Sequence, residues 1–298
     1  MQLIDRLRAG ETPYVEPGLA ELLADARPAI TFTTDAGNAE VTDTSIVLVP
    51  TPSDAFSPEF SSAFVELACR DLASALNARV RPRYHLIVIS STLLPGATAG
   101  KIVPLLEEML QQRAGHDFGV AYVPDFVALG EVVRGFQNPP FLLIGSDDPR
   151  ASAQAVALYR RIAAPDTPIR TLSLRDAEIA KVAHNVFMCL KVSFANFLAQ
   201  LGDRMGGADL DGITETLALE PKIGAGYLRA GGAFGGPCLP RDTMALNHLA
   251  QSLGLNASLA RAADEINAAQ YDLIDAMCSR RGHVASPCSA FPSNRDPR

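Results

Sequence analysis

The segment GGAFGGPCLPRDTMAL, residues 231–246, has the composition expected around a cysteine nucleophile. Four glycines precede Cys238, and a glycine backbone can approach a ligand closely. Pro237 and Pro240 are typical of the first turn of a helix, so we expect a helix to begin just after the cysteine. A thiol at a helix N-terminus lies near the positive end of the backbone dipole, which favours the reactive thiolate. A lone cysteine is more often an inert buried residue, but these neighbours favour a nucleophile at Cys238.

Asp242 lies four residues after Cys238, which is one turn of the expected helix. Its negative charge opposes formation of the thiolate, so we expect it to position a water molecule or a hydrogen bond. The alternative is an acidic residue of the first turn that interacts only with the helix dipole.

Lys181 and Asn185 have the same four-residue spacing within DAEIAKVAHNVF. A cation and an amide donor on one helix face can stabilise a developing alkoxide or oxyanion. Such a pair alone is usually a solvated surface strip. Here the helix is apolar nearly all round, so a buried lysine needs a partner or a function.

The first half of the chain alternates short apolar runs with longer helical patterns, which predicts a parallel α/β sheet with right-handed crossovers. We expect buried strands at 29–33, 45–49, 86–90, 120–123 and 141–144, and a closing strand at 169–172. We expect helices near 57–76, 97–112 and 149–162.

From Asp176 onward the pattern is helical. We expect Asp176 to cap a long helix that runs to about Leu201 and ends at Gly202 and the Gly206–Gly207 pair. Two apolar stripes on this helix predict burial on two faces, one against the α/β domain and one against a second subunit. A core helix of a monomer is the alternative. Further helices are expected at 209–219, 240–253 and 256–280.

Composition excludes several functional classes. At 298 residues we expect one large or two modest domains, and the net charge of −7 with no basic block argues against nucleic acid. No apolar run approaches the roughly 18 residues that span a bilayer. The first residues lack a secretory h-region, so we expect a cytoplasmic protein. The five dispersed cysteines, without CxxC spacing, argue against disulfides and a metal site.

Five motifs carry a resemblance to a known family. They are VPTP (49–52), SSTLLPG (90–96), YVPDFVALGEVVRGFQNPPFLLIG (122–145), AEIAKVAHNVFMCLKVSFANFLAQL (177–201) and FGGPCLPRD (234–242). In this order they resemble the UDP-glucose/GDP-mannose dehydrogenase family, from about residue 16 to about residue 277. The resemblance implies a partial Rossmann-like parallel sheet in an NAD-binding domain, residues 1–173. An all-helical central and dimerisation domain with the catalytic cysteine would follow at 174–281, and a disordered tail at 282–298.

The resemblance implies an NAD-dependent, two-step oxidation of a nucleotide-sugar C6 alcohol to a carboxylate. Cys238 would form a thiohemiacetal with the aldehyde and then a thioester, and Lys181 would act as general base. Asn185 and Asp242 would orient the oxygen and its water. The substrate would be a UDP- or GDP-hexose, and the protein would be a homodimer through the 176–201 helix.

Further site residues follow from the same resemblance. Catalytic roles extend to Asp125 and Thr92. Cofactor contacts are implied for Thr51, Pro52, Thr92, Asp125 and Arg241. Substrate contacts are implied for Phe126, Lys181, Asn185, Lys222, Phe234 and Gly235.

Some positions depart from the family pattern. Asp125 and Leu129 stand where glutamates are usual, Lys222 where arginine is common, and Arg241 where lysine is common. The strand, GxGxxG turn and helix that begin the family's NAD-binding domain are missing, as is the C-terminal nucleotide-binding domain. We therefore expect weakened NAD binding. A catalytically weak or inactive dimerising remnant is the alternative, and a third hypothesis is a dehydrogenase that performs only the aldehyde-to-acid half.

Overall fold

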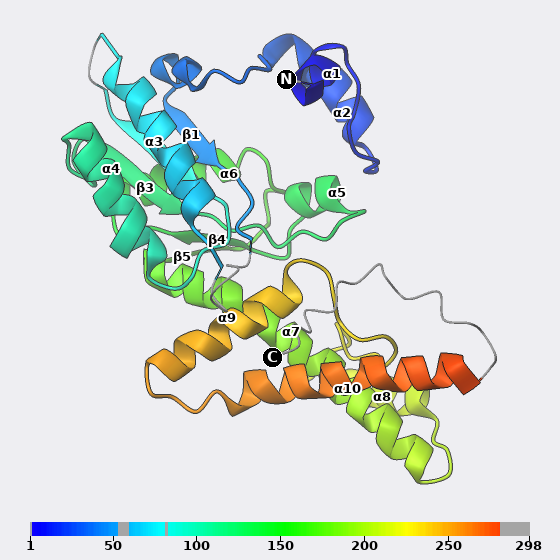
Figure 1. Cartoon of the computed structure of the whole chain (residues 1–298). Helices are drawn as coiled ribbons and strands as arrows, with labels where there is room; N and C mark the ends of the chain where they lie inside the picture. Colours follow the sequence, from blue (N-terminus) through cyan, green and yellow to red (C-terminus); the bar gives the residue numbers. More distant parts are fainter. Residues whose placement is uncertain (1, 53–59, 81–82, 281–298) are drawn as a thin grey trace. The chain divides into compact units, whose positions relative to one another are not determined.

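The computed structural model describes residues 2–52, 60–80 and 83–280, which form two compact units (Figure 1). The first unit comprises residues 1–52 and 61–180, and the second comprises residues 53–60 and 181–298. The units divide inside the long helix α7 (Leu174–Arg204). The domain limits expected from the sequence, 1–173 and 174–281, stay a prediction. The expected tail, 282–298, lies outside the described residues.

The first unit is built on a five-stranded sheet of order β1-β2-β3-β4-β5. The strands are β1 (Thr44–Val47), β2 (His85–Ile89), β3 (Phe118–Tyr122), β4 (Leu142–Gly145) and β5 (Ile169–Leu172). β1 pairs with β2, β2 with β3 and β4 with β5 in parallel. All residues of β2 and β3 are buried, as the continuous apolar runs predict.

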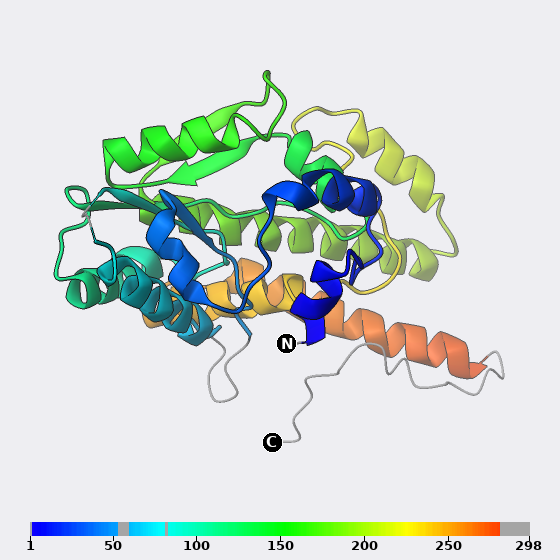
Figure 2. The ribbon, with the colours of Figure 1, turned by 90° about the horizontal axis from the view of Figure 1, so that it is seen from above.

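Helices cover both faces of this sheet because successive side chains of each strand point to opposite sides. Ile87 and Ile89 pack with α3 (Ala63–Asn77) and α4 (Val103–Leu110). Leu86 and Val88 pack with α6 (Pro149–Tyr159) on the other face (Figure 2). The expected helices of this unit are thus present with shifted ends, and the part of the helix predicted at 57–59 lies outside the described residues.

Two expectations about the sheet are wrong. Residues 30–33 form no strand, and a short 3-10 helix, η1 (Arg27–Ala29), precedes them. A strand needs a hydrogen-bonded neighbour, and among the described strands β1 pairs only with β2. The sheet is also mixed, because β3 and β4 pair antiparallel at Tyr122 and Gly145. The chain between them folds back through α5 (Val132–Gln137), which the sequence analysis missed.

The N-terminal part of the first unit contains α1 (Gln2–Arg8), α2 (Leu19–Ala26) and η2 (Ala36–Val41). Glu16 connects this part to the chain just before α5. Its carboxylate accepts hydrogen bonds from the backbone N–H groups of Gly130 at 2.9 Å and Val132 at 2.6 Å. Glu16 therefore helps to anchor this segment, and Arg79 holds η2 through hydrogen bonds to the carbonyls of Ala39 and Glu40.

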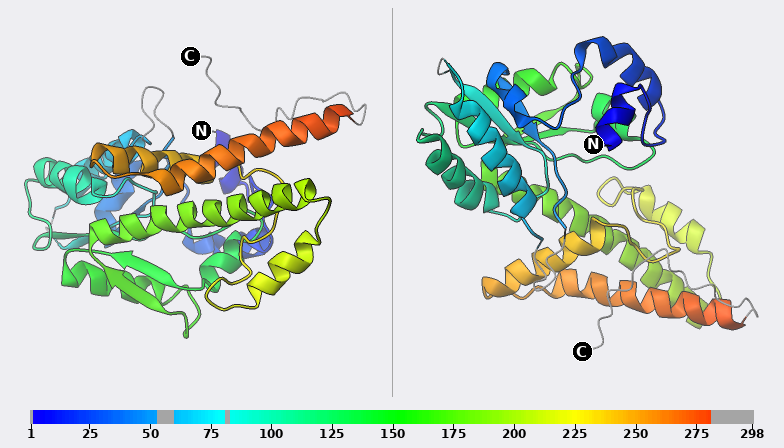
Figure 3. Two further views of the ribbon diagram at one scale, coloured as in Figure 1. Left: turned by 90° about the horizontal axis from the view of Figure 1, so that it is seen from below. Right: turned by 45° about the horizontal axis from the view of Figure 1, so that its top comes forward.

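The second unit is helical, as expected. After α7 come α8 (Leu210–Ala218), α9 (Leu239–Ser252) and α10 (Ser258–Arg280), and α7 and α10 lie side by side (Figure 3). The N-cap of α7 is Ser173, whose hydroxyl accepts the N–H of Asp176 at 3.1 Å, so the expected Asp176 cap is wrong. Gly202 lies inside α7, and the left-handed glycines Gly206 and Gly207 follow the helix end.

Candidate active site

Cys238 occupies the N-cap position of α9, as its flanking prolines predict. The helix begins at Leu239 with Pro240 in its first turn, and Gly236, with a φ of 77°, turns the backbone just before the cysteine. The thiol is exposed and makes no capping hydrogen bond. An accessible sulfur at the positive end of a helix is suited to nucleophilic attack.

Asn185 of α7 and Asp242 of α9 meet directly. The Asn185 Nδ2 donates a 2.6 Å hydrogen bond to the Asp242 Oδ2, and both side chains are buried. The backbone N–H of Asp242 donates to the carbonyl of Cys238 at 2.9 Å, so Asp242 lies one turn into the cysteine's helix. The asparagine of the predicted lysine–asparagine pair therefore contacts the helix that begins at Cys238.

Arg241 balances the charge of Asp242. Its Nε and Nη2 atoms both lie 2.8 Å from the Asp242 Oδ1, and its guanidinium packs over the ring of Phe60 at 4.7 Å from the centroid. Asp242 is fully buried, so an unpaired carboxylate there would be costly. The pairing compensates the negative charge that the sequence analysis expected to oppose a thiolate at Cys238.

Lys181 lies one turn before Asn185 and is buried, with 7% of its surface exposed. His184 directly precedes Asn185 in the sequence, and its Nδ1 lies 3.2 Å from the Asn185 Oδ1. Burial lowers the pKa of His184, and the nearby Lys181 charge lowers it further. The carboxamide of Asn185 is therefore fixed between His184 and Asp242.

A second cysteine lies close to the first turn of α9. Cys189 of α7 is fully buried and accepts a hydrogen bond from the Thr243 hydroxyl at 3.4 Å. Burial raises the pKa of this thiol to about 11. Cys189 is therefore a protonated packing residue, in contrast to the exposed Cys238.

The site residues predicted in the first unit follow the carboxyl ends of its strands. Thr51 and Pro52 follow β1, Thr92 follows β2, and Asp125 follows β3. Because β1, β2 and β3 are parallel, these ends meet at one edge of the sheet, where open α/β sheets bind ligands. The structure thus brings these four residues to one edge.

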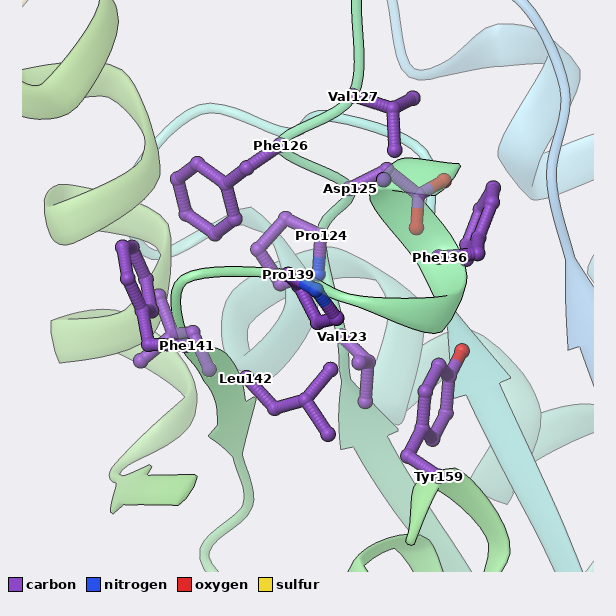
Figure 4. Close-up of a pocket in the computed structure, with 12 residues that line it drawn as sticks. Val123, Pro124, Asp125, Phe126, Val127, Phe136, Pro139, Phe141, Leu142 and Tyr159 are labelled. Atoms are coloured by element: carbon purple, nitrogen blue, oxygen red, sulfur yellow. The ribbon is translucent and has the colours of Figure 1, made fainter. Parts of the chain in front are cut away.

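Asp125 and Phe126 line a pocket shown in Figure 4. The rings of Phe126 and Phe141 pack at 4.8 Å between centroids, and Tyr159 of α6 lines the same pocket. The Tyr159 hydroxyl lies 3.3 Å from the Ser90 hydroxyl. Burial raises the pKa of Tyr159, and the Asp125 charge raises it further. Sequence reasoning missed Tyr159, because nothing in its helix distinguishes it from a core residue.

Glu178 is a second residue that sequence reasoning missed. It is fully buried in α7, and its carboxylate accepts hydrogen bonds from the Gly96 N–H at 2.5 Å, the Thr98 N–H at 2.8 Å and the Thr98 hydroxyl at 2.6 Å. These bonds hold the loop that carries Thr92. The sequence does contain a signal that could have identified Glu178: it lies seven residues before Asn185, which places both on one helix face.

The remaining predicted substrate residues lie between α8 and α9. Lys222 is exposed, and the Lys191 Nζ donates to the neighbouring carbonyls of Ile223 and Gly224 at 3.0 Å each. Phe234 is buried, and Gly235 is partly exposed. The described residues contain no cluster of side chains that could hold a metal ion.

By length and composition, α7 alone among the described helices could cross a membrane, with a mean hydropathy of 1.3 over its most apolar window. Buried core helices of soluble proteins have the same properties. Glu178, Lys181, Asn185 and Asn196 are buried along α7, so these four polar side chains face protein. The length and hydropathy of α7 are therefore weak evidence for a membrane span.

Comparison with known proteins shows which family this chain belongs to. Residues 1–163 match the NAD binding domain of the UDP-glucose/GDP-mannose dehydrogenase family, and residues 175–269 match its central domain. The GDP-mannose 6-dehydrogenase of Azotobacter vinelandii is 35% identical over 289 residues, which are 93% of this chain and 64% of that protein. The chain thus spans slightly less than two thirds of the length of this curated relative.

Two solved structures are also similar. The UDP-glucose dehydrogenase of Pyrobaculum islandicum has a TM-score of 0.86 and 32% identity, over 94% of this chain and 64% of that one. The GDP-mannose dehydrogenase of Pseudomonas aeruginosa has a TM-score of 0.70 and 30% identity, over 92% and 64%. Both domain matches and these relatives lead to one conclusion: the chain belongs to the UDP-glucose/GDP-mannose dehydrogenase family, whose cofactor is NAD.

Proposed function

We propose that this chain is a nucleotide-sugar 6-dehydrogenase, which oxidises the C6 alcohol of a UDP- or GDP-hexose to a carboxylate in two NAD-dependent steps. The observation that carries the proposal is the 2.6 Å hydrogen bond between Asn185 and Asp242. It connects the helix with the buried Lys181 to the helix that begins at the exposed Cys238. A base, an oxyanion donor and a nucleophile are what this oxidation needs.

NAD, when bound, accepts a hydride in each of the two oxidations. The residues present fit one end of such a cofactor. Thr51, Thr92 and Asp125 gather at the carboxyl edge of the sheet, and Thr51 is buried there. The sequence contains no GxGxxG turn, the element that holds the pyrophosphate in dinucleotide-binding folds. Thr51, Pro52, Thr92, Asp125 and Arg241 are the residues we propose to contact NAD.

In the first oxidation we propose that Lys181 accepts the proton of the C6 hydroxyl and stabilises the alkoxide together with Asn185. The Cys238 thiolate then adds to the aldehyde carbon, which forms a thiohemiacetal. Loss of the second hydride converts this adduct to a thioester. Water attacks the thioester, releases the carboxylate and returns the thiol. Asp125 and Thr92 are the further residues for which we propose catalytic roles.

The partners of Asp242 refine its proposed role. One of its carboxylate oxygens is shared by two nitrogens of Arg241 and the other accepts from Asn185. It therefore holds the Asn185 carboxamide in a fixed orientation, and its charge is compensated at a distance of one turn from Cys238. Both effects support an oxyanion site next to a thiolate.

Substrate binding is proposed at Phe126, Lys181, Asn185, Lys222, Phe234 and Gly235. A lysine at position 222 offers a point charge to a phosphate or sugar rather than the two-pronged contact of an arginine. We further propose a cytoplasmic homodimer. The exposed face of α7 supports it, because Phe187, Phe194 and Leu201 are 63%, 48% and 45% exposed. Large apolar side chains that share one helix face typically meet a partner.

The decisive experiment measures NADH formation and product with UDP-glucose and with GDP-mannose. We expect two NADH per sugar acid and a covalent sugar adduct on Cys238 in intact-protein and peptide mass spectra. The variant Cys238→Ser should lose activity by about three orders of magnitude or more. Cys69→Ala is the matched control, because Cys69 is buried in α3 and burial raises its pKa to about 12.

The possible outcomes separate the hypotheses. One NADH per sugar with an aldehyde substrate only would indicate a dehydrogenase that performs the second half. A dimer without NADH formation, whose Cys238 is alkylated no faster than a free thiol at neutral pH, would identify a remnant. Activity that survives in Cys238→Ser would contradict the covalent route.

A further inference from the structure

The backbone just before Cys238 is hydrogen-bonded to side-chain amides from two helices. We infer that Asn196 of α7 and Asn267 and Gln270 of α10 are positioning residues for Cys238, which act by fixing the loop at residues 231–234. This inference rests on the proposed function, in which Cys238 is the nucleophile. We call these three side chains the amide clamp.

The N-terminal end of the loop is held from both helices. The Asn196 Oδ1 accepts the Gly231 N–H at 2.9 Å, and its Nδ2 donates to the Gly232 carbonyl at 3.2 Å. From α10, the Gln270 Nε2 donates to the Gly231 carbonyl at 2.6 Å. Gly231 therefore has both of its backbone groups bonded, one to each helix.

The C-terminal end of the loop is held by Asn267. Its Oδ1 accepts the Phe234 N–H at 2.7 Å, and its Nδ2 donates to the Phe234 carbonyl at 2.9 Å. One carboxamide thus pairs with both backbone groups of one residue, as a neighbouring strand would. The Phe234 side chain is buried in a cluster with Cys189 and Ala263, so Phe234 is fixed by packing as well.

The amide clamp is itself rigid. Asn196 is 0% exposed, Asn267 7% and Gln270 6%, although asparagine and glutamine are mostly surface residues. The Gln270 Oε1 accepts from the Gln200 Nε2 at 3.0 Å, and the buried Ser193 hydroxyl donates to the Ala263 carbonyl at 2.9 Å. These bonds connect α7 to α10 directly. The donors and acceptors of the amide clamp are therefore held in place independently of the loop.

The position of the Cys238 sulfur depends on the hydrogen bonds between the amide clamp and the loop. Residues 231–238 contain four glycines, and a glycine-rich segment has more conformational freedom than any other. Only residues 235–237 separate the clamped Phe234 from Cys238, and Pro237 removes one further degree of freedom. A misplacement of about 1 Å at a reacting group costs about a hundredfold in rate, so fixing this loop is a catalytic requirement.

The test compares clamp variants on two different helices, Asn196→Ala and Asn267→Ala, in the full chain. We expect both to lower kcat about a hundredfold and to change the KM for NAD by less than about threefold, because only the transition state needs the aligned sulfur. We also expect slower alkylation of Cys238 by iodoacetamide, measured on its peptide. Cys238 is already exposed, so a looser loop cannot accelerate this reaction by uncovering it.

Gln251→Ala is the matched control, because it removes an exposed side-chain amide of α9 that donates a hydrogen bond to Asn247 on the same helix. If an alanine variant does not fold, Gln270→Met keeps the length of the side chain, adds no buried charge and removes the donor to Gly231. Folded variants that retain the parent kcat and the parent Cys238 labelling rate would overturn the inference. If the parent itself produces no NADH, the proposed function fails, and Cys238 labelling alone decides on the amide clamp.

Discussion

At the scale of single residues, two buried carboxylates in this chain are stabilised in different ways. Asp242 has a cation at 2.8 Å and a neutral amide at 2.6 Å. Glu178 accepts two backbone N–H groups and one hydroxyl, and burial outweighs them, so its pKa is raised. Asp242 is therefore part of an ion pair near the cysteine, whereas Glu178 serves as the acceptor that organises a loop.

Glu178→Gln should destabilise the chain by about 3 kcal/mol. A carboxamide keeps one acceptor and turns an NH₂ group toward donors, so buried N–H or O–H groups lose their partner. Urea unfolding monitored by circular dichroism measures the change. Glu108→Gln, at an exposed position of α4, should change the free energy of unfolding by less than about 0.5 kcal/mol. An equal effect of both substitutions would contradict the role of Glu178.

Asp264 of α10 should make stability depend on pH. Burial raises its pKa from 3.8 to about 6, so the folded chain binds this proton more tightly than the unfolded chain. Stability then falls as pH rises from about 4 to about 6, by about 1 kcal/mol once solvent screening of this half-buried group is allowed for. Thermal unfolding of Asp264→Asn should show a gain over the parent at pH 7 that disappears near pH 4. A gain that is independent of pH would contradict this origin.

At the scale of elements, α7 combines a cap, a core stripe and an exposed face in one helix. Val182, Val186 and Cys189 on one side of α7 are buried, whereas Ile179, which was expected in the same stripe, is 44% exposed. Phe187, Phe194 and Leu201 on another side are exposed in the single chain. The N-cap lies three residues earlier than expected, at Ser173, and a hydroxyl is as good an N-cap as a carboxylate. Local sequence thus determines the existence of the helix better than its first residue.

Ser173→Ala should lower the free energy of unfolding by about 1 kcal/mol, because the Asp176 N–H loses its acceptor. Chemical denaturation measures the loss. Ser173→Asp should restore most of the stability, since aspartate also caps helices. If the aspartate variant is as unstable as the alanine variant, the Ser173 hydroxyl does not act as the cap.

Much of the fold could be predicted from sequence, and the failures have physical causes. The apolar runs of β2 and β3 and the periodic helices of the second unit carry their structure locally. The run AITFT at 29–33 also has the β-branched and aromatic residues typical of a strand, yet no strand forms, because a strand needs a neighbour to pair with. Cys238, Lys181, Asn185 and Asp242 follow from type and spacing. Asn267 and Tyr159 could not be predicted in this way, because their partners are distant in sequence.

At the scale of the whole molecule, the exposed face of α7 predicts self-association. We expect a mass of about twice 31.7 kDa by light scattering at micromolar concentration. Phe187→Glu should shift this mass to that of a monomer, because a charge at a side chain that is 63% exposed in the single chain would be buried in the interface. Leu219→Glu is the control, since Leu219 lies on α8's C-cap and is 82% exposed. A parent monomer would contradict the dimer.

The 298 residues should bind NAD weakly. If a glycine-rich turn supplies two charge-assisted hydrogen bonds of about 1.5 to 3 kcal/mol each, a chain without one binds about two to four orders of magnitude less tightly. Isothermal titration calorimetry against a full-length family member measures the difference. Equal affinity of the two proteins would show that this chain holds the pyrophosphate by other groups.

The route of the chain through its second unit limits how the protein can be divided for study. Phe60, which is 4% exposed, belongs to that unit although it is far in sequence from the helices it joins, and its ring covers the guanidinium of Arg241. A recombinant fragment cut at the start of α7 would lack this ring. Water would then reach the Arg241–Asp242 pair and weaken it. Dissection into separately expressed pieces should therefore disturb the cysteine's surroundings, even where the cut leaves every predicted catalytic side chain of that unit in place.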